Sequence, residues 1–161
     1  MTWYFGLTST LKNKLQIIQN KMVRFILQLG PREHVGQVQI QEAGFLKVCD
    51  RVTQLSMNIV HDVFYGKSPT YLKPFFKKVS DVHSYNTRSS GYGFYRGTHN
   101  FAGEKAKNTI DQKTFHFNTS KEWNSLPNHL KAISNKQTFK IRLKAYLKGR
   151  GYLSEPSQSV S

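Results

Sequence analysis

Acidic residues are scarce in this sequence, and long apolar runs are missing. The 161 residues include nine Asp and Glu against 24 Lys and Arg, which gives a formal net charge of +15. This charge favours polyanionic partners, above all nucleic acid. No apolar run approaches the roughly 18 to 20 residues that a spanning helix needs, so we expect no membrane span.

Cysteine is nearly absent as well. Cys49 is the single cysteine, which excludes a disulfide framework and a cysteine-based zinc site and is typical of a reducing compartment. The apolar start, residues 1–7, lacks a basic n-region, a long apolar h-region and a small-residue cleavage site. We therefore expect a protein of the nucleus or cytoplasm that is not secreted.

The length suggests one ordinary core. We expect a single helical domain over residues 1–152 and a disordered, polar tail over residues 153–161. A first helix is predicted by apolar residues at steps of three and four, with an N-cap among Thr8, Ser9 and Thr10 and an end at Gly30-Pro31. Its apolar residues are Leu11, Leu15, Ile18, Met22, Phe25, Ile26 and Leu29.

A second helix follows from the same kind of pattern, and residues 32–43 between the two read as a connection. Gly66 is placed to cap its C-terminus. Two prolines in residues 68–76 leave room for a short helical turn at most. The apolar residues of the second predicted helix are Val48, Val52, Leu55, Ile59 and Val63.

The middle of the chain gives a different signal. Residues 81–108 are rich in Gly, Ser, Asn, Thr and aromatics without a helical period, which predicts a loop or an extended ribbon. Residues 114–118 alternate, with Phe115 and Phe117 on one side, and are the best strand candidate. We therefore expect one short strand or hairpin near Phe115.

The last third is predicted to be helical again. Ser120 can cap a segment that carries Trp123 and Leu126, and Leu130 with Ile133 can continue its apolar face after Pro127. Residues 134–137 have capping-box spacing and open a last helix, which residues 149–151 should stop. Its buried stripe is Phe139, Leu143, Tyr146 and Leu147.

The expected fold is mainly α, with four to five helices, one short strand or hairpin and a long loop that is both aromatic and basic. The core is expected to come from the first, second and last helices.

Two groups of residues are candidates for nucleic-acid binding. The first is a row of lysines at steps of four on the last helix, and residues 131–150 around it contain no Asp or Glu. Such a row can follow phosphates without reading bases, although a simple solvated face stays open as an alternative. Its members are Lys136, Lys140, Lys144 and Lys148.

The second group lies in the loop between residues 77 and 113, where Tyr85, Arg88, Tyr92 and Arg96 interleave rings and charges. Aromatic faces can stack on unpaired bases while Arg holds the backbone. The alternative is that these rings cover a core that lacks regular structure.

Catalytic patterns are missing. Asp50, Asp62, Asp81 and Asp111 form no adjacent pair of the kind that a two-metal polymerase uses. A nuclease reading fails because Ala106 stands where the lysine after Glu104 is required. No histidines pair at helical metal-site spacing, and Cys49 reads as a core residue. We expect no enzyme activity, no catalytic residue, no metal, no cofactor and no small-molecule substrate.

Four motifs follow one another in order along the chain. They are Leu15-Gln16-Ile17-Ile18-Gln19-Asn20-Lys21 with Arg24, His83-Ser84-Tyr85-Asn86-Thr87-Arg88-Ser89, Glu122-Trp123-Asn124-Ser125-Leu126-Pro127, and Ser134 with Phe139-Lys140 and Leu143-Lys144-Ala145-Tyr146-Leu147. In order and spacing this set resembles the C-terminal region of jockey-like, LINE-type non-LTR retrotransposon reverse transcriptases. The resemblance covers residues 11–147, and its most specific part is the Trp-Asn-x-Leu-Pro block with the helix that follows.

The resemblance implies a non-catalytic region that helps the element's polymerase to hold RNA or DNA, because the catalytic carboxylates of that family lie outside this region. It implies RNA or DNA as partners, and the polymerase domain of the parent element as another. Two alternatives stay open. One is a helical docking module whose charge serves only solubility, and the other is a degenerate fragment with no activity.

Overall fold

The computed structural model describes residues 2–82, 99–102 and 108–153. Within these residues the fold is mainly α, as predicted, and the only β-pairing is an isolated antiparallel bridge between Lys78 and Phe101. The α-helices are α1 (Thr2–Gly6), α2 (Ser9–Ile26), α3 (Gln37–Glu42), α4 (Val48–Phe64), α5 (Val79–Val82), α6 (Phe115–Ser125), α7 (Asn128–Lys131) and α8 (Lys136–Leu153), and two 3-10 helices span Thr70–Phe75 and Asp111–Lys113.

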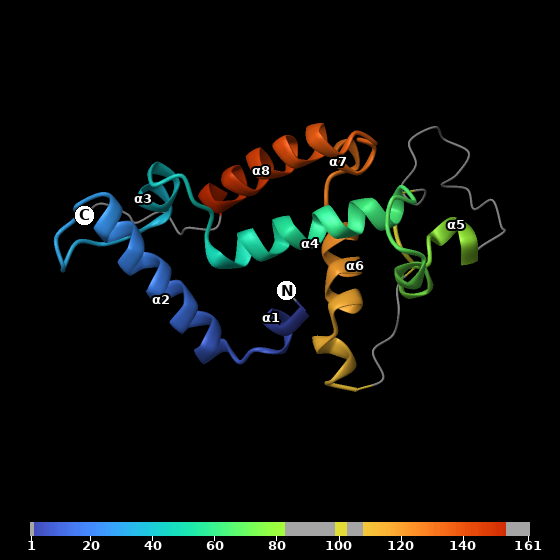
Figure 1. The fold of residues 1–161 in the computed structure, drawn as a ribbon, viewed down its shortest axis with the longest axis horizontal. Coiled ribbons are helices and arrows are strands. Elements are labelled where there is room, and N and C mark those ends of the chain that lie inside the picture. The colour runs from blue at the N-terminus through green and yellow to red at the C-terminus, as the bar shows by residue number, and fades with distance from the viewer. Residues whose placement is uncertain (1, 83–98, 103–107, 154–161) are drawn as a thin grey trace.

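The main core lies where α4, α6 and α8 meet. In Figure 1, α8 runs alongside α4 in the opposite direction, and α6 crosses below α4. The predicted stripe of α8 fills this junction, since Phe139, Leu143 and Leu147 are fully buried. The other buried residues of this core are Leu46, Met57, Val60, Val63, Phe64, Phe76, Phe101, Trp123 and Leu126.

The first predicted helix exists as α2, and Thr8 caps it as expected, because its Oγ1 accepts a bond from the amide N of Leu11 at 3.4 Å. The expectation that this helix joins the main core is wrong. Figure 1 shows α2 leaving the α4–α8 pair at an angle. Its single buried residue, Val23, packs with Val35 and Ile40 in a separate, smaller cluster.

The strand expected at residues 114–118 is also wrong, because these residues form the first turns of α6, which starts after Thr114. Phe115 and Phe117 alternate as a strand would, yet Phe115, Thr119 and Trp123 also repeat at steps of four. Thr119 and Trp123 are both fully buried, so the helical period decides the structure. Ser120 accordingly lies inside the helix and caps nothing.

Three smaller expectations need correction. Residues 32–43 contain the short helix α3 in addition to a connection. At the start of α8, Asn135 takes the capping position expected of Ser134, because its Oδ1 accepts bonds from the amides of Gln137 and Thr138 at 2.9 and 3.1 Å. Helix α8 passes through Gly149 and ends at Leu153.

The predicted stop at Gly30-Pro31 is placed too late, because α2 already ends at Ile26. Two other turn signals are confirmed. Gly66 follows α4 with a φ of +71°, the left-handed conformation that ends many helices. The residues around Pro69 and Pro74 form a single short 3-10 helix, Thr70–Phe75. The tail beyond Leu153 lies outside the described residues.

Candidate nucleic-acid interface

The four lysines of α8, here called the lysine row, do not share one environment. A step of four residues turns about 40° around a helix, so the row drifts by about 120° from Lys136 to Lys148. The buried stripe of Phe139, Leu143 and Leu147 has the same step of four and drifts equally, so Lys140, Lys144 and Lys148 each stay about 100° around the axis from the stripe residue before them. Lys144 is exposed, while Lys140 and Lys148 are half-buried.

Lys136 differs because its Nζ forms an ion pair with Asp62 of α4. The carboxylate offsets the charge of this lysine, and the pair ties the first turn of α8 to α4. Lys140, Lys144 and Lys148 therefore carry the charge that the row can offer to a phosphate. Since each residue adds about 1.5 Å along the axis, these three span about 12 Å.

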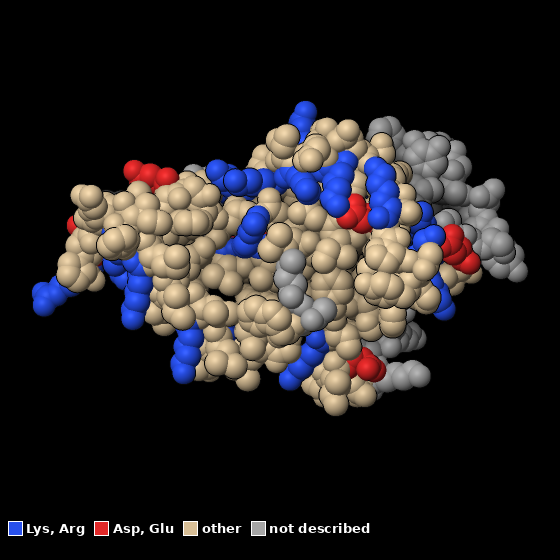
Figure 2. Space-filling view, viewed as in Figure 1, with Lys and Arg blue, Asp and Glu red and all other residues tan. Residues whose placement is uncertain are grey.

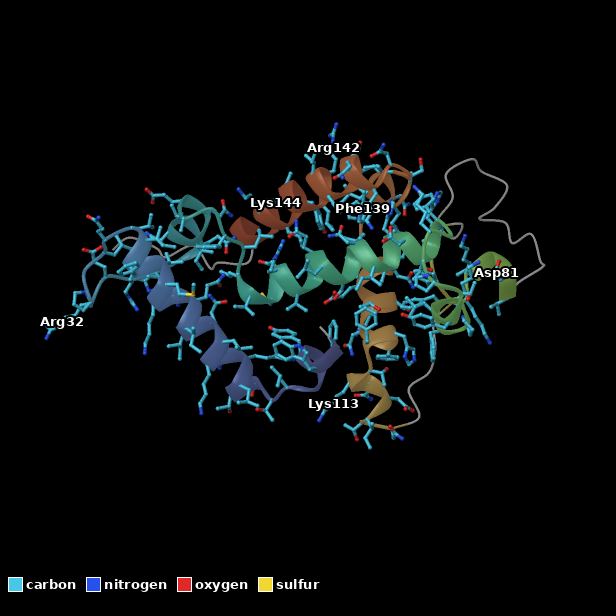
Figure 3. The ribbon with its side chains drawn as sticks, in the orientation of Figure 1. Arg32, Asp81, Lys113, Phe139, Arg142 and Lys144 are labelled. Atoms are coloured by element: carbon cyan, nitrogen blue, oxygen red, sulfur yellow. The ribbon has the colours of Figure 1, made fainter. Side chains whose placement is uncertain are left out.

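Acidic groups are few around this row. Figure 2 shows Lys and Arg side chains gathered over α8, with little acidic surface between them. Figure 3 places Phe139 between α8 and α4 and Arg142 on the side of α8 that faces away from α4. Arg142 is an exposed cation that the four-residue spacing did not include.

The N-terminal end of α8 is held in place by the C-terminal end of α4. The hydroxyl of Tyr65 donates to the carbonyl of Lys131 at 2.7 Å, and Nζ of Lys67 donates to the carbonyl of Ser134 at 3.3 Å. His61 Nε2 lies 2.8 Å from the carbonyl of Ile133. These bonds hold the residues that lead into α8 against the end of α4, and Lys67 adds an exposed cation beside the start of the lysine row.

His61 is fully buried, and its ring stacks on Phe139 with centroids 4.4 Å apart. Because the partner of Nε2 is a carbonyl, that nitrogen must carry the hydrogen. Burial lowers the pKa of His61 below its ordinary value of 6.5. The imidazole is therefore neutral in the folded chain at pH 7.

Acidification is expected to destabilise the fold through His61. Its folded pKa is lowered, so below pH 6.5 the unfolded chain binds more protons than the folded chain. Its contribution is complete above 6.5 and is lost as the pH falls toward the folded pKa, by at most about 1.4 kcal/mol per pH unit. Urea unfolding at pH 7.5, 6 and 5 measures this loss.

The matched variant for this prediction is His61→Gln, which keeps an N–H donor without a titratable ring. Burial also lowers the pKa of His99, so some dependence on pH should remain in the variant. An equally steep loss of stability in both proteins would exclude His61 as the cause.

The Trp-Asn-x-Leu-Pro block has a structural task. Trp123 Nε1 donates to the carbonyl of His99 at 2.7 Å. Asn124 bonds Phe101 twice, accepting from its amide and donating to its carbonyl, both at 2.9 Å. Leu126 is buried, and Pro127 precedes α7. The block thus anchors residues 99–102, here called the anchored segment, to the main core.

Lys131 completes this anchor. Its side chain is 2% exposed, and its Nζ donates to Asn100 Oδ1 at 2.8 Å and to the carbonyl of Asn124 at 3.1 Å. Burial lowers the pKa of this amine. Lys131 therefore serves the fold, although by sequence it looks like one more surface cation.

The second predicted group, Tyr85, Arg88, Tyr92 and Arg96, lies outside the described residues. The residues on either side of that loop are joined to each other. The amide of Val79 donates to the carbonyl of Asn100 at 3.1 Å, and the amide of Ala102 donates to the carbonyl of Lys77 at 2.8 Å. These two bonds join residues 77–79 to residues 100–102, here called the base of the loop, and Phe101 within it is buried in the main core.

A hollow of about 490 Å³ lies beside this base. Phe64 and Phe76 line it, but both rings are buried, and Nζ of Lys78 covers the face of Phe64 at 4.3 Å from the ring centroid. These rings form a wall and offer no open face for a base. The hollow adds positive charge through Lys73 and Lys78, with Asp81 beside them.

Cys49 was expected in the core, but it is exposed on the first turn of α4. Desolvation of the thiol, followed by the charge of Asp50, raises its pKa, which disfavours the nucleophilic thiolate. Among the described residues, no three His, Cys, Asp or Glu side chains come together as a metal site would require.

Comparison with known proteins gives no match: no protein-family model, no curated protein and no solved structure matches this chain. Over the part of the chain that the structure describes, no helix has both the length and the apolar character needed to cross a bilayer.

Proposed function

We propose that this chain binds the phosphate backbone of RNA or DNA through Lys140, Lys144 and Lys148 of α8, as a non-catalytic module. The proposal includes the origin that the sequence motifs imply, the C-terminal region of a LINE-type reverse transcriptase. The observation that carries it is the geometry of α8. Its apolar stripe packs in the main core, so the lysines lie on the part of the helix surface that the stripe does not occupy. Asp62 is already ion-paired with Lys136, the first lysine of the row.

One further cation extends this surface, because Lys67 lies at the start of the row. Arg142 is two residues from both Lys140 and Lys144, so it lies on another side of α8 and is not part of this surface. A rigid helix with cations along its length positions phosphates but carries no donor pattern that selects a base. We therefore expect affinity without marked sequence preference.

Tight binding that falls steeply with salt is the expected result for the full chain. Affinity for a short single-stranded RNA and for a matched DNA duplex is measured by fluorescence anisotropy at several salt concentrations. Each phosphate contact adds about 0.9 to the slope of log K against log salt on duplex DNA and about 0.7 on a single strand. A folded chain, checked by circular dichroism, that binds neither probe would rule the function out.

A further inference from the structure

The apolar stripe of α2 faces solvent. Leu11, Leu15, Ile18, Met22 and Phe25 follow one another at steps of four and three, and this set is here called the apolar stripe. Ile18 and Met22 are each 55% exposed and Phe25 is 86% exposed. At about 100° per residue the stripe covers about 80° of the helix circumference. This width is typical of a seam that receives one other helix.

The opposite side of α2 packs, and it does so through polar groups. Gln16 Oε1 accepts from the amide of Val48 at 3.1 Å, and Gln19 Nε2 donates to the carbonyl of Leu46 at 2.8 Å. Gln16 and the buried Val23 lie about 120° to 140° around the axis from the centre of the stripe. Turning the stripe inward would break these bonds, so its exposure is built into the fold.

One edge of the stripe carries positive charge. Lys14 and Lys21 lie seven residues apart on one edge, where a partner helix would place its flanking residues. Among the described residues neither forms an ion pair with a carboxylate, and α2 itself contains no Asp or Glu. A second copy of this chain would offer no carboxylate of α2 to Lys14 and Lys21 and would add positive charge to the interface, which disfavours a homodimer through this face.

We propose that the apolar stripe of α2 is a docking site for an amphipathic α-helix of another protein. This partner helix has an apolar seam at heptad spacing and carboxylates along the edge that meets Lys14 and Lys21. The seam supplies the buried area, and the opposite charges set the register. This site is on a different helix from the lysine row and does not depend on nucleic-acid binding.

The probe for this site is a synthetic three-heptad helix with Leu at the seam positions and Glu at the flanking positions. A matched peptide carries Lys in place of each Glu. The full chain is compared with the double variant Ile18→Ser, Phe25→Ser, whose side chains are exposed enough for the fold to survive. The double variant Ile110→Ser, Ile141→Ser is the control, since both residues are exposed apolar side chains away from α2.

Binding is measured by isothermal titration calorimetry. The Glu peptide should bind the wild type and the control variant with equal affinity. It should bind the stripe variant at least about tenfold more weakly. The Lys peptide should bind none of them. Affinity for RNA should be unchanged in the stripe variant. This separates a failure of the docking site from a failure of the proposed function.

Three results overturn the proposal. The first is a Glu peptide that does not bind the wild type or that binds the stripe variant equally well. The second is a dimer of the chain in analytical ultracentrifugation that the stripe variant loses, which would assign the stripe to a second copy. The third is stripe-dependent binding to phosphatidylserine-containing vesicles without peptide binding, which would assign it to a lipid surface.

Discussion

Replacing Lys140, Lys144 and Lys148 together with glutamine is expected to lower the slope of log K against log salt by about two to three units. Over the part of the chain that the structure describes, no ion pair offsets the charge of these three lysines, whereas Lys136 is paired with Asp62. Three lost contacts on duplex DNA amount to a slope change of about 2.7. Between 50 and 200 mM salt, wild-type affinity should then fall about 40-fold more than that of the variant.

The control is a variant with the same loss of charge elsewhere, Lys14→Gln, Lys21→Gln, Lys121→Gln. All three residues are exposed, two on α2 and one on α6. Its slope should change much less, because general attraction to a basic protein does not need close contact with phosphates. Equal slopes for the two variants would mean that net charge drives binding and that α8 has no special part in it.

Replacing Trp123 with alanine is expected to remove about 3 to 5 kcal/mol of stability, the usual loss for a buried tryptophan. The side chain is fully buried, and its ring stacks on Phe64 with centroids 5.5 Å apart. The variant also loses the bond to the carbonyl of His99. This loss is a large part of the roughly 5 to 15 kcal/mol that stabilises a typical domain, so the melting temperature should fall by roughly 6 to 20 °C.

The second tryptophan provides a matched control. Trp3 is 59% exposed, so Trp3→Ala should change stability by no more than about 0.5 kcal/mol. The variant Trp123→Phe separates packing from hydrogen bonding, because it retains an aromatic ring but leaves the carbonyl of His99 without this donor. Thermal unfolding followed by circular dichroism compares the three. Similar melting temperatures for Trp3→Ala and Trp123→Ala would contradict the anchoring role of the block.

Sequence periodicity predicted the helices whose apolar residues enter the main core. Phe139, Leu143 and Leu147 on α8 repeat at helical spacing and are buried as that spacing indicates. On α4 the periodicity located the helix, but of the predicted apolar residues only Val63 is buried, and Met57, Val60 and Phe64 supply the rest of its apolar core. It failed at residues 114–118, where a five-residue window shows alternation and only the longer window reaching Trp123 shows the helix. It also failed for α2, because a period locates an apolar face but does not say what covers that face.

The candidate site was predictable in part. The four lysines of α8 follow from their spacing, but two facts needed the structure. Asp62 is 74 residues from Lys136 in the chain and still offsets its charge. Lys131 looks like a surface cation in the sequence, yet it bonds Asn100 in the interior. Charge counting cannot separate such lysines from free ones, because the distinction depends on contacts between distant segments.

The polar packing of α2 has an evolutionary consequence. Gln16 and Gln19 hold the helix in place, so the fold places little demand on Ile18, Met22 or Phe25. Under neutral drift these exposed positions should turn polar faster than the buried positions of α4 and α8. Related sequences that keep them apolar would record selection for an interaction, separate from selection for folding.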